Sequence, residues 1–288
     1  MIFNSDTNSV YTLLKASEEF LSLKNLLTPK FDSELLLSYV LQIKQTRLPL
    51  VRNQKLTNNQ ILRYEKCILR RSKREPIAYI TGFKGFMNFE FKVNKSVLIP
   101  RPETELLVEI ALELAKNENK ESVLDLCTGS GCIAISLAKL RKFKNIVASD
   151  INSNALKVAK KNSQINNVFN IKFVKSDMFD NINGERFDII ISNPPYVSKE
   201  EYDLLESELK YEPKLALIAQ DDGMFFYKEI SSKALNYLNN DGFILLELNA
   251  NKFHEIRHIF LSNSKYKNVE IMNDYSGLSR ILKTKINR

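Results

Sequence analysis

The chain has 288 residues and a formal net charge of +8, and this length allows one large domain or two unequal ones. Its 44% hydrophobic and 26% charged residues are the composition of a soluble globular protein. No apolar segment is long enough to span a bilayer, and residues 1–6 lack the basic and apolar regions of a leader peptide. We therefore expect a cytoplasmic protein without a membrane partner.

The cysteines argue against disulfides and zinc sites, whereas the net charge does not identify a partner. The three cysteines, Cys67, Cys127 and Cys132, lack the CxxC spacing of a zinc knuckle, and their odd number argues against a disulfide framework. The positive charge would suit a polyanionic partner such as RNA. Lysine, asparagine and isoleucine are abundant throughout the chain, however, so basicity alone does not identify a partner.

The first quarter of the chain has a helical pattern. From about Ser5 to Arg74 apolar residues recur at helical spacing, and Thr57 stands where it would cap a third helix. We predict a small helical domain over residues 1–75, with a role in substrate recognition. Its third helix ends in the basic run 70–74, which is typical of a solvated helix end but could also contact an acidic partner.

Residues 76–100 are predicted to link two domains. The segment 75–82 breaks the helical period, and phenylalanines interleaved with glycine and asparagine over residues 83–94 indicate a β-hairpin. Pro100 and Pro102 then impose an extended turn before a helix that runs to about Asn117.

From Ser122 onward, apolar strands alternate with amphipathic helices, as in a doubly wound sheet. We assign residues 101–288 to this α/β domain. Its expected parallel strands are 122–126, 145–149, 170–174, 187–192 and 243–248. Two further strands, 269–272 and 279–283, have no helix between them, so we expect the last strand to enter the sheet antiparallel.

A glycine loop follows the first of these strands. Residues 123–126 indicate a strand and residues 132–135 the start of a helix, with Gly129 and Gly131 between them. Glycines let the backbone pass close to a ligand at a helix N-terminus. Asp150 ends the next strand, where its carboxylate can accept both hydroxyls of a ribose. The pattern predicts a nucleoside site at this edge of the sheet.

The same glycine spacing also fits a dinucleotide-binding fold. Cys127 stands where a tight glycine would be expected, and no histidine lies near a strand end to assist hydride transfer. Adenosine with a methionine tail suits the loop better. Asp177 and Met178, after the third strand, would then flank the adenine, and the alternative is an ordinary turn acid after a strand.

The strand predicted over 187–192 is closed by the four residues Asn193, Pro194, Pro195 and Tyr196. Proline has no N–H and ends strand pairing, so the Asn side chain is presented at the carboxyl end of the strand. In open α/β sheets ligands bind at that edge. A rigid amide beside a tyrosine ring suits a flat, amide-bearing substrate, and the alternative is an ordinary Pro-Pro turn with a surface tyrosine.

The last part of the chain contains a pattern that resembles a zinc site. His254 to His258 matches the HExxH pattern of zinc proteases. These are the only histidines in the chain, Arg257 lies inside the motif, and no third ligand is evident. A solvated helix explains the pattern, and we expect no metal site.

Taken together, the motifs resemble the release factor glutamine methyltransferases, the PrmC or HemK family, over nearly the whole chain. The resemblance is carried by the segments EPIAYITG (75–82), IPRPETE (99–105), DLCTGSG (125–131), DIIISNPPY (188–196) and EPKLAL (212–217). The NPPY tetrapeptide alone is shared with N-methyltransferases that act on nucleic-acid bases. Its combination with IPRPETE is far more specific.

The resemblance implies a seven-stranded, Rossmann-like S-adenosylmethionine-dependent methyltransferase domain behind a small helical domain and a hairpin linker. It implies methyl transfer to the side-chain N5 of a glutamine in the GGQ-type motif of peptide-chain release factors, with S-adenosylhomocysteine as product. The implied cofactor residues are Cys127, Thr128, Gly129, Ser130, Gly131, Asp150, Asp177, Met178 and Asn193. The implied substrate residues are Asn193, which is also the catalytic residue, Pro194, Pro195 and Tyr196.

Two positions depart from the family pattern, since Cys127 and Asn249 stand where glycine is common. Two other functions remain open at this point. One is methylation of an exocyclic amine on DNA or RNA, which the positive charge keeps possible. The other is a binding module that keeps the fold without catalysis, although the intact glycine loop, Asp150 and NPPY segment argue against it.

Overall fold

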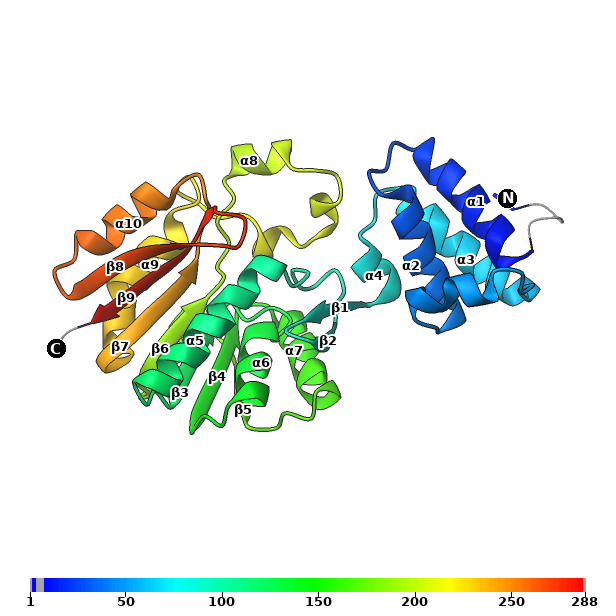
Figure 1. The fold of residues 1–288 in the computed structure, drawn as a ribbon. Helices are drawn as coiled ribbons and strands as arrows, with labels where there is room; N and C mark the ends of the chain where they lie inside the picture. Colours follow the sequence, from blue (N-terminus) through cyan, green and yellow to red (C-terminus); the bar gives the residue numbers. More distant parts are fainter. Residues whose placement is uncertain (1, 4–7, 287–288) are drawn as a thin grey trace. The chain divides into compact units, whose positions relative to one another are not determined.

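The computed structural model describes residues 2–3 and 8–286, and the chain divides into two compact units (Figure 1). One unit contains the chain up to Gly82 together with Glu206–Tyr211, and the other contains Phe83–Leu205 and the chain from Glu212 onward. Ser5, where the helical pattern was expected to begin, lies outside the described residues, as do the terminal residues of the predicted domain ranges.

The first unit is helical, as expected. Its elements are α1 (Val10–Ser22), α2 (Pro29–Leu41), η1 (Gln45–Val51), α3 (Asn58–Arg71), α4 (Ile77–Thr81) and η3 (Leu209–Tyr211). Thr57 caps α3 by accepting a hydrogen bond from the backbone N–H of Gln60, which confirms the predicted cap. The core includes Tyr64, whose hydroxyl donates to the carbonyl of Ser33 at 3.1 Å.

The expectation that 75–82 is non-helical was wrong, because the five-residue helix α4 forms there. Pro76 precedes its first residue and Gly82 ends it in the left-handed conformation, with φ of +84°. A helix of five residues is too short to show a hydrophobic period, which is why sequence reasoning missed it.

The basic run at the end of α3 is not a solvated helix end, contrary to expectation. Arg71 is buried and pairs with buried Asp32 of α2, with Nε and Oδ2 2.7 Å apart. Arg70 pairs with Glu75 at 2.7 Å, and Arg74 pairs with Glu208 at 3.2 Å. These arginines hold the helical unit together, because each has an acidic partner within the unit.

The second unit is built on a seven-stranded sheet preceded by a hairpin. Its strands are β1 (Phe83–Phe86), β2 (Phe89–Lys92), β3 (Ser122–Leu126), β4 (Asn145–Asp150), β5 (Ile171–Lys175), β6 (Phe187–Ser192), β7 (Leu238–Glu247), β8 (Tyr266–Asn273) and β9 (Ser279–Ile286). Strands β1 and β2 form the expected hairpin. The sheet order is β5-β4-β3-β6-β7-β9-β8, with β9 antiparallel to both neighbours as predicted.

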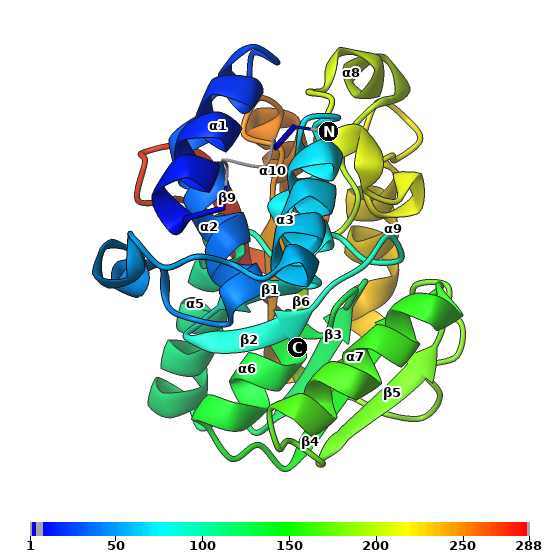
Figure 2. The same ribbon diagram turned by 90° about the vertical axis from the view of Figure 1, so that its right-hand side faces the viewer.

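Helices cover both faces of this sheet (Figures 1 and 2). The helical elements of the unit are η2 (Pro102–Thr104), α5 (Glu105–Asn117), α6 (Cys132–Leu140), α7 (Ser153–Ile165), α8 (Lys199–Leu204), η4 (Lys214–Ala216), α9 (Phe225–Lys233), η5 (Ala234–Asn236) and α10 (Phe253–Leu261). Helices α5 and α6 pack on one face and α9 and α10 on the other. The expected doubly wound α/β architecture is confirmed.

The strands alternate between these two cores. In β3, Val123 faces the α5–α6 core, whereas Leu124 and Leu126 face the α9–α10 core. Strand β7 begins at Leu238 rather than at the expected residue 243, and its pairing with β6 shifts register in between. The sequence pattern does not predict this extension, because residues 239–241 are polar and show no alternation of apolar residues.

Among the helices formed by residues 2–3 and 8–286, none has both the length and the apolarity that crossing a bilayer requires.

Candidate active site

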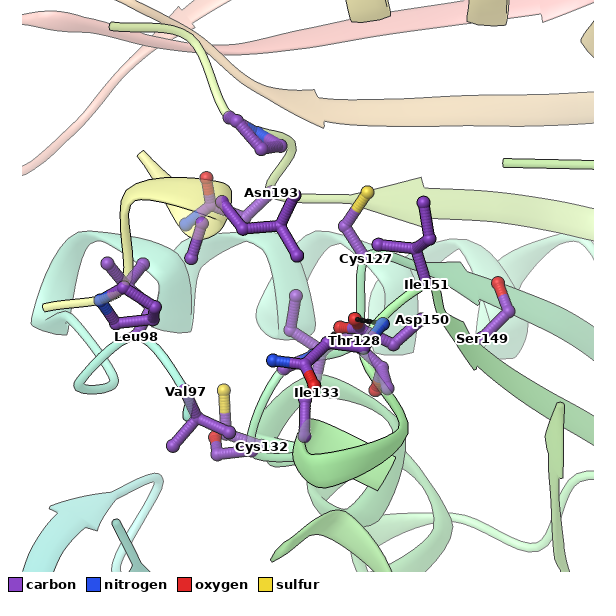
Figure 3. A pocket seen from close by; sticks show the side chains of 18 of the residues that line it. Val97, Leu98, Cys127, Thr128, Cys132, Ile133, Ser149, Asp150, Ile151 and Asn193 are labelled. Atoms are coloured by element: carbon purple, nitrogen blue, oxygen red, sulfur yellow. Dashed lines mark hydrogen bonds between the residues drawn. The ribbon is translucent and has the colours of Figure 1, made fainter. Parts of the chain in front are cut away.

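A cavity opens at the carboxyl ends of the parallel strands of the second unit (Figure 3). Its lining comes from the β3–α6 loop, the ends of β4 and β6, the turn after β5, and the segments 96–104 and 213–216. Parallel strands place all their carboxyl ends at one edge, so residues far apart in sequence meet there. The predicted residues on this lining are Cys127, Thr128, Gly129, Ser130, Asp150, Asp177, Met178, Asn193 and Pro195.

The glycine loop takes a tight path through left-handed conformations. Cys127, Gly129 and Gly131 have φ values of +59°, +54° and +80°. The left-handed conformation is less favourable for a residue with a side chain than for glycine, which gives a physical reason for glycine being common at position 127. Burial raises the pKa of the Cys127 thiol, so this part of the lining is neutral.

Gly131 is not on the cavity lining. A Cβ atom at this position would lie 2.9 Å from Cδ1 of Ile135 and 3.0 Å from Cβ of Ala159. Its lack of a side chain therefore allows α6 to approach α7, and Figure 2 shows these two helices side by side. The structure gives Gly131 a packing role, and its contact with the cofactor stays a prediction.

Asp150 lies at the end of β4 with its carboxylate at the cavity (Figure 3). Oδ2 accepts the backbone N–H of Gly129 at 2.9 Å, and Oδ1 accepts that of Asn152 at 2.8 Å. Burial raises the pKa of this carboxyl, whereas the two backbone donors act in the opposite direction. Each oxygen keeps accepting capacity beyond its one donor, as a ribose diol would need.

Asp125 stabilises the glycine loop, a role that was not predicted from the sequence. It is fully buried, and its Oδ2 accepts the Thr128 hydroxyl at 2.6 Å and the backbone N–H of Ala134 at 3.2 Å. Burial raises its pKa to about 7. These bonds tie the glycine loop to the start of α6. The sequence feature that could have indicated this role is an acidic residue shortly before a glycine turn that contains Thr128.

The turn after β5 supplies an apolar wall. Met178 is buried in a left-handed conformation with φ of +41°, and the Ser176 hydroxyl donates to its carbonyl at 2.9 Å. Its sulfur lies 3.9 Å from the Cys127 sulfur, so the two side chains form one continuous surface. Asp177 beside it is exposed and also lines the cavity.

Asn193 follows β6 directly and reaches the cavity from its other side (Figure 3). Its Nδ2 donates to the hydroxyl oxygen of Thr104 at 3.2 Å. Pro195 lines the cavity with it, whereas Pro194 and Tyr196 do not. The Tyr196 hydroxyl instead donates to Oε1 of Glu247 at a long 3.5 Å.

Comparison with known proteins decides the family. A family model described as the PrmC N-terminal domain matches residues 12–82, and one described as the Methyltransferase small domain matches residues 102–210. A release factor glutamine methyltransferase of Leptospira interrogans is 39% identical over 96% of this chain and 97% of its own. One from Aliivibrio fischeri is 34% identical over 95% and 96%.

The chain belongs to the release factor glutamine methyltransferase family. Solved structures share the methyltransferase fold at low identity. A methyltransferase from Pyrococcus furiosus aligns with a TM-score of 0.51 at 17% identity, covering 81% of this chain and all of that one. A 16S rRNA methyltransferase from T. thermophilus, solved with AdoMet and guanosine, aligns with a TM-score of 0.52 at 17% identity, covering 72% of this chain and 50% of that one.

Two buried carboxylates of this methyltransferase, Glu212 and Glu247, hold the segment before α5, and neither has a role predicted from the sequence. Glu212 accepts the backbone N–H of Ile99 at 2.9 Å and also binds Arg101. Glu247 accepts the Thr104 hydroxyl at 2.6 Å. The segment 99–104 is thus fixed against the cavity from two sides. The family motifs IPRPETE and EPKLAL contain four of these five residues, but spacing alone does not reveal the contacts.

The HExxH histidines lie apart from this site. His254 and His258 are both exposed on α10. Across residues 2–3 and 8–286, no group of three or more His, Cys, Asp or Glu side chains is arranged to hold a metal ion.

Proposed function

We propose that this methyltransferase transfers a methyl group from S-adenosylmethionine to the side-chain N5 of the glutamine in the GGQ-type motif of peptide-chain release factors. One observation carries the proposal. The amide of Asn193 and the carboxylate of Asp150 line the same cavity at the carboxyl edge of the sheet, in a chain of the release factor glutamine methyltransferase family. A substrate amide and an adenosine cofactor can therefore meet there.

The residues present fit the cofactor chemically. Asp150 has accepting capacity for the two ribose hydroxyls, since each oxygen receives one backbone donor. Met178 offers an apolar surface for the adenine, with Asp177 beside it. The loop from Cys127 to Gly131 would hold the methionine part, and its first four residues line the cavity. When bound, S-adenosylmethionine supplies an electrophilic methyl group and leaves as S-adenosylhomocysteine.

The protein's task is to orient the substrate amide. An amide nitrogen is a poor nucleophile because its lone pair is delocalised into the carbonyl, so alignment contributes much of the rate. We assign Oδ1 of Asn193 and the backbone carbonyl of Pro194 as acceptors for the two amide hydrogens. Both bonds strengthen as positive charge develops on the nitrogen, which stabilises the transition state more than the bound substrate.

Tyr196 is assigned to packing beside the planar amide. We assign no general base, because the methylated nitrogen is acidic enough to release its proton to water. The helical domain over residues 1–75 is proposed to recognise the release factor, and its match to the PrmC N-terminal domain model supports this. A cytoplasmic location belongs to the same proposal, because release factors act in translation.

The decisive experiment measures transfer of labelled methyl from S-adenosylmethionine to three acceptors. These are a release factor, the same release factor with its GGQ glutamine changed to alanine, and total nucleic acid. We expect label only in the unmodified release factor. Label only in nucleic acid would support methylation of an exocyclic amine on DNA or RNA and reject methylation of a release factor. Absence of S-adenosylhomocysteine binding in calorimetry would favour a module without catalysis.

The catalytic assignment predicts the behaviour of Asn193→Ala. We expect turnover to fall about a hundredfold or more, as on loss of a transition-state hydrogen bond. Affinity for S-adenosylhomocysteine, measured by calorimetry, should stay within about threefold, because removing an acceptor for substrate leaves the glycine loop and Asp150 intact. Turnover within a few-fold of the wild type would refute the role of Asn193.

A further inference from the structure

We propose that Thr104 and Glu247 are positioning residues that fix the orientation of the Asn193 side chain, so that its Oδ1 faces the substrate. The proposal deepens the proposed function and rests on it. The three residues come from three separate segments: Thr104 is in η2, Asn193 directly follows β6, and Glu247 ends β7. Neighbouring strands β6 and β7 bring the last two together.

The hydrogen bonds form a chain with a defined direction. Thr104 Oγ1 lies 2.6 Å from Oε2 of Glu247, the length of a hydroxyl bond to an ionised carboxylate. A threonine hydroxyl has a single proton, and an ionised carboxylate only accepts. When Glu247 is ionised, Thr104 therefore donates to it, and the Thr104 oxygen is left to accept from Asn193.

That direction decides which end of the Asn193 amide faces the cavity. Nδ2 lies 3.2 Å from Thr104 Oγ1 and donates to it. The oxygen of the same amide must then point away from Thr104. Asn193 lines the cavity, so this leaves Oδ1 as the acceptor offered to a substrate amide. The opposite rotamer would present donors to the donors of the substrate, which cannot form a hydrogen bond.

Glu247 also contacts Tyr196, which lies behind the cavity lining. Its Oε1 accepts from the Tyr196 hydroxyl, and burial keeps the pKa of Tyr196 above its ordinary value, so the phenol remains a donor. The Tyr227 hydroxyl donates to the backbone carbonyl of Glu247 at 3.0 Å, which fixes the end of β7. The buried Glu247 carboxylate thus orients Asn193 through Thr104, and it makes a longer contact with Tyr196 at 3.5 Å.

The arrangement depends on the charge of Glu247. Burial raises the pKa of Glu247 to about 7, while the Thr104 bond lowers it. Of the charged and titratable groups around Glu247, some raise its pKa and others lower it. Arg280 on β9 and Arg101 lower the pKa, and Glu103 raises it; Tyr196, Tyr227 on α9 and the Cys132 thiol on α6 are protonated neighbours.

A protonated Glu247 can reverse the chain. Its carboxyl can donate to Thr104, whose hydroxyl proton is then free to point at Asn193 and favour the rotamer with Oδ1 turned toward Thr104. Turnover should therefore rise with pH through about 7, where the carboxylate forms, and stay high above it. Glu247→Gln keeps the shape and can donate through its amide, so it should resemble the protonated state at every pH.

The test measures kcat and KM with a release factor as substrate and S-adenosylhomocysteine affinity by calorimetry. We expect Thr104→Val and Glu247→Gln to lower kcat about tenfold or more, with cofactor affinity within about threefold of wild type. Thr104→Ser keeps the hydroxyl and should restore most of the activity. Thr284→Val removes another buried threonine hydroxyl, which donates to the Lys267 carbonyl, and should leave kcat unchanged.

A structural role alone would give a different pattern. It would lower kcat in Thr104→Val and Glu247→Gln without flattening the pH profile of Glu247→Gln, and serine would not rescue position 104. That result, or kcat of both variants within twofold of wild type, would overturn the positioning proposal while Asn193→Ala remains impaired. If the wild type does not methylate a release factor, or if Asn193→Ala remains active, the proposed function fails instead.

Discussion

Gly131→Ala tests the packing role that the structure gives to the last glycine of the loop. The new Cβ would lie 2.9 Å from Cδ1 of Ile135, 3.0 Å from Cβ of Ala159 and 3.3 Å from Cα of Ala159. Two of these three atoms belong to Ala159, which has no flexible side chain to move aside. The backbone adds a second cost, because φ at this position is +80°.

The two costs can be estimated separately. A left-handed conformation costs an alanine about 1–2 kcal/mol relative to glycine. Overfilling a packed contact costs about 1–3 kcal/mol. We therefore expect Gly131→Ala to lower the free energy of unfolding by about 2–5 kcal/mol, a large part of the stability of a typical domain.

A matched control separates the two costs. Gly184 has a φ of +70°, and no atom lies within 4 Å of a Cβ built there. Gly184→Ala should therefore show only the conformational cost of about 1–2 kcal/mol. Both glycines belong to the sheet-containing unit, so the same unfolding transition reports on both.

Urea unfolding followed by far-ultraviolet circular dichroism suits this comparison, because the chain has no tryptophan to report by fluorescence. The midpoints and slopes of the two variants and the wild type give the differences in free energy. Equal destabilisation by Gly131→Ala and Gly184→Ala would refute the close helix contact and return Gly131 to a role in the loop conformation alone.

Two other predictions concern buried charges. Arg71→Ala leaves the Asp32 carboxylate buried without its ion pair and should destabilise the helical unit by about 3–5 kcal/mol in urea unfolding. Lys73→Ala, at an exposed position, should change the free energy of unfolding by less than about 0.5 kcal/mol. Similar effects of the two substitutions would contradict the buried ion pair. Asp125 has its pKa raised to about 7 by burial, against an ordinary value near 4, so its stabilising contribution is complete below about pH 4 and is lost as the pH rises through 7. Between pH 5 and 8 the wild type should therefore lose about 2–3 kcal/mol more stability than Asp125→Asn, because about two pH units of this shift fall in that window. Parallel pH profiles would show that Asp125 is not the group responsible.

Local sequence patterns predicted most of the architecture. Strands and helices of the sheet domain were found because each repeats its apolar residues with a period set by its own backbone. The antiparallel last strand followed from the missing helix before it, and the structure confirms it. The errors were local as well. Helix α4 was too short to show a period, and the start of β7 is polar.

The basic run after α3 shows a different kind of error. A charged helix end is usually solvated, and nothing near Arg71 in sequence marks it as buried. Its partner Asp32 lies 39 positions earlier, on another helix. Because an ion pair depends on how helices pack, a pattern read along one helix cannot reveal it.

The sequence by itself determined which elements form, which edge of the sheet carries the ligand-binding loops, and which family the motifs resemble. Only the tertiary structure decided what those residues contact. Thr104 meets Asn193 across 89 positions and Glu247 across 143. The structure also shows that Gly131 lets α6 approach α7. The physical reason is that periodicity is a property of each segment, whereas hydrogen bonds between segments depend on the order of strands in the sheet, which places β6 beside β7.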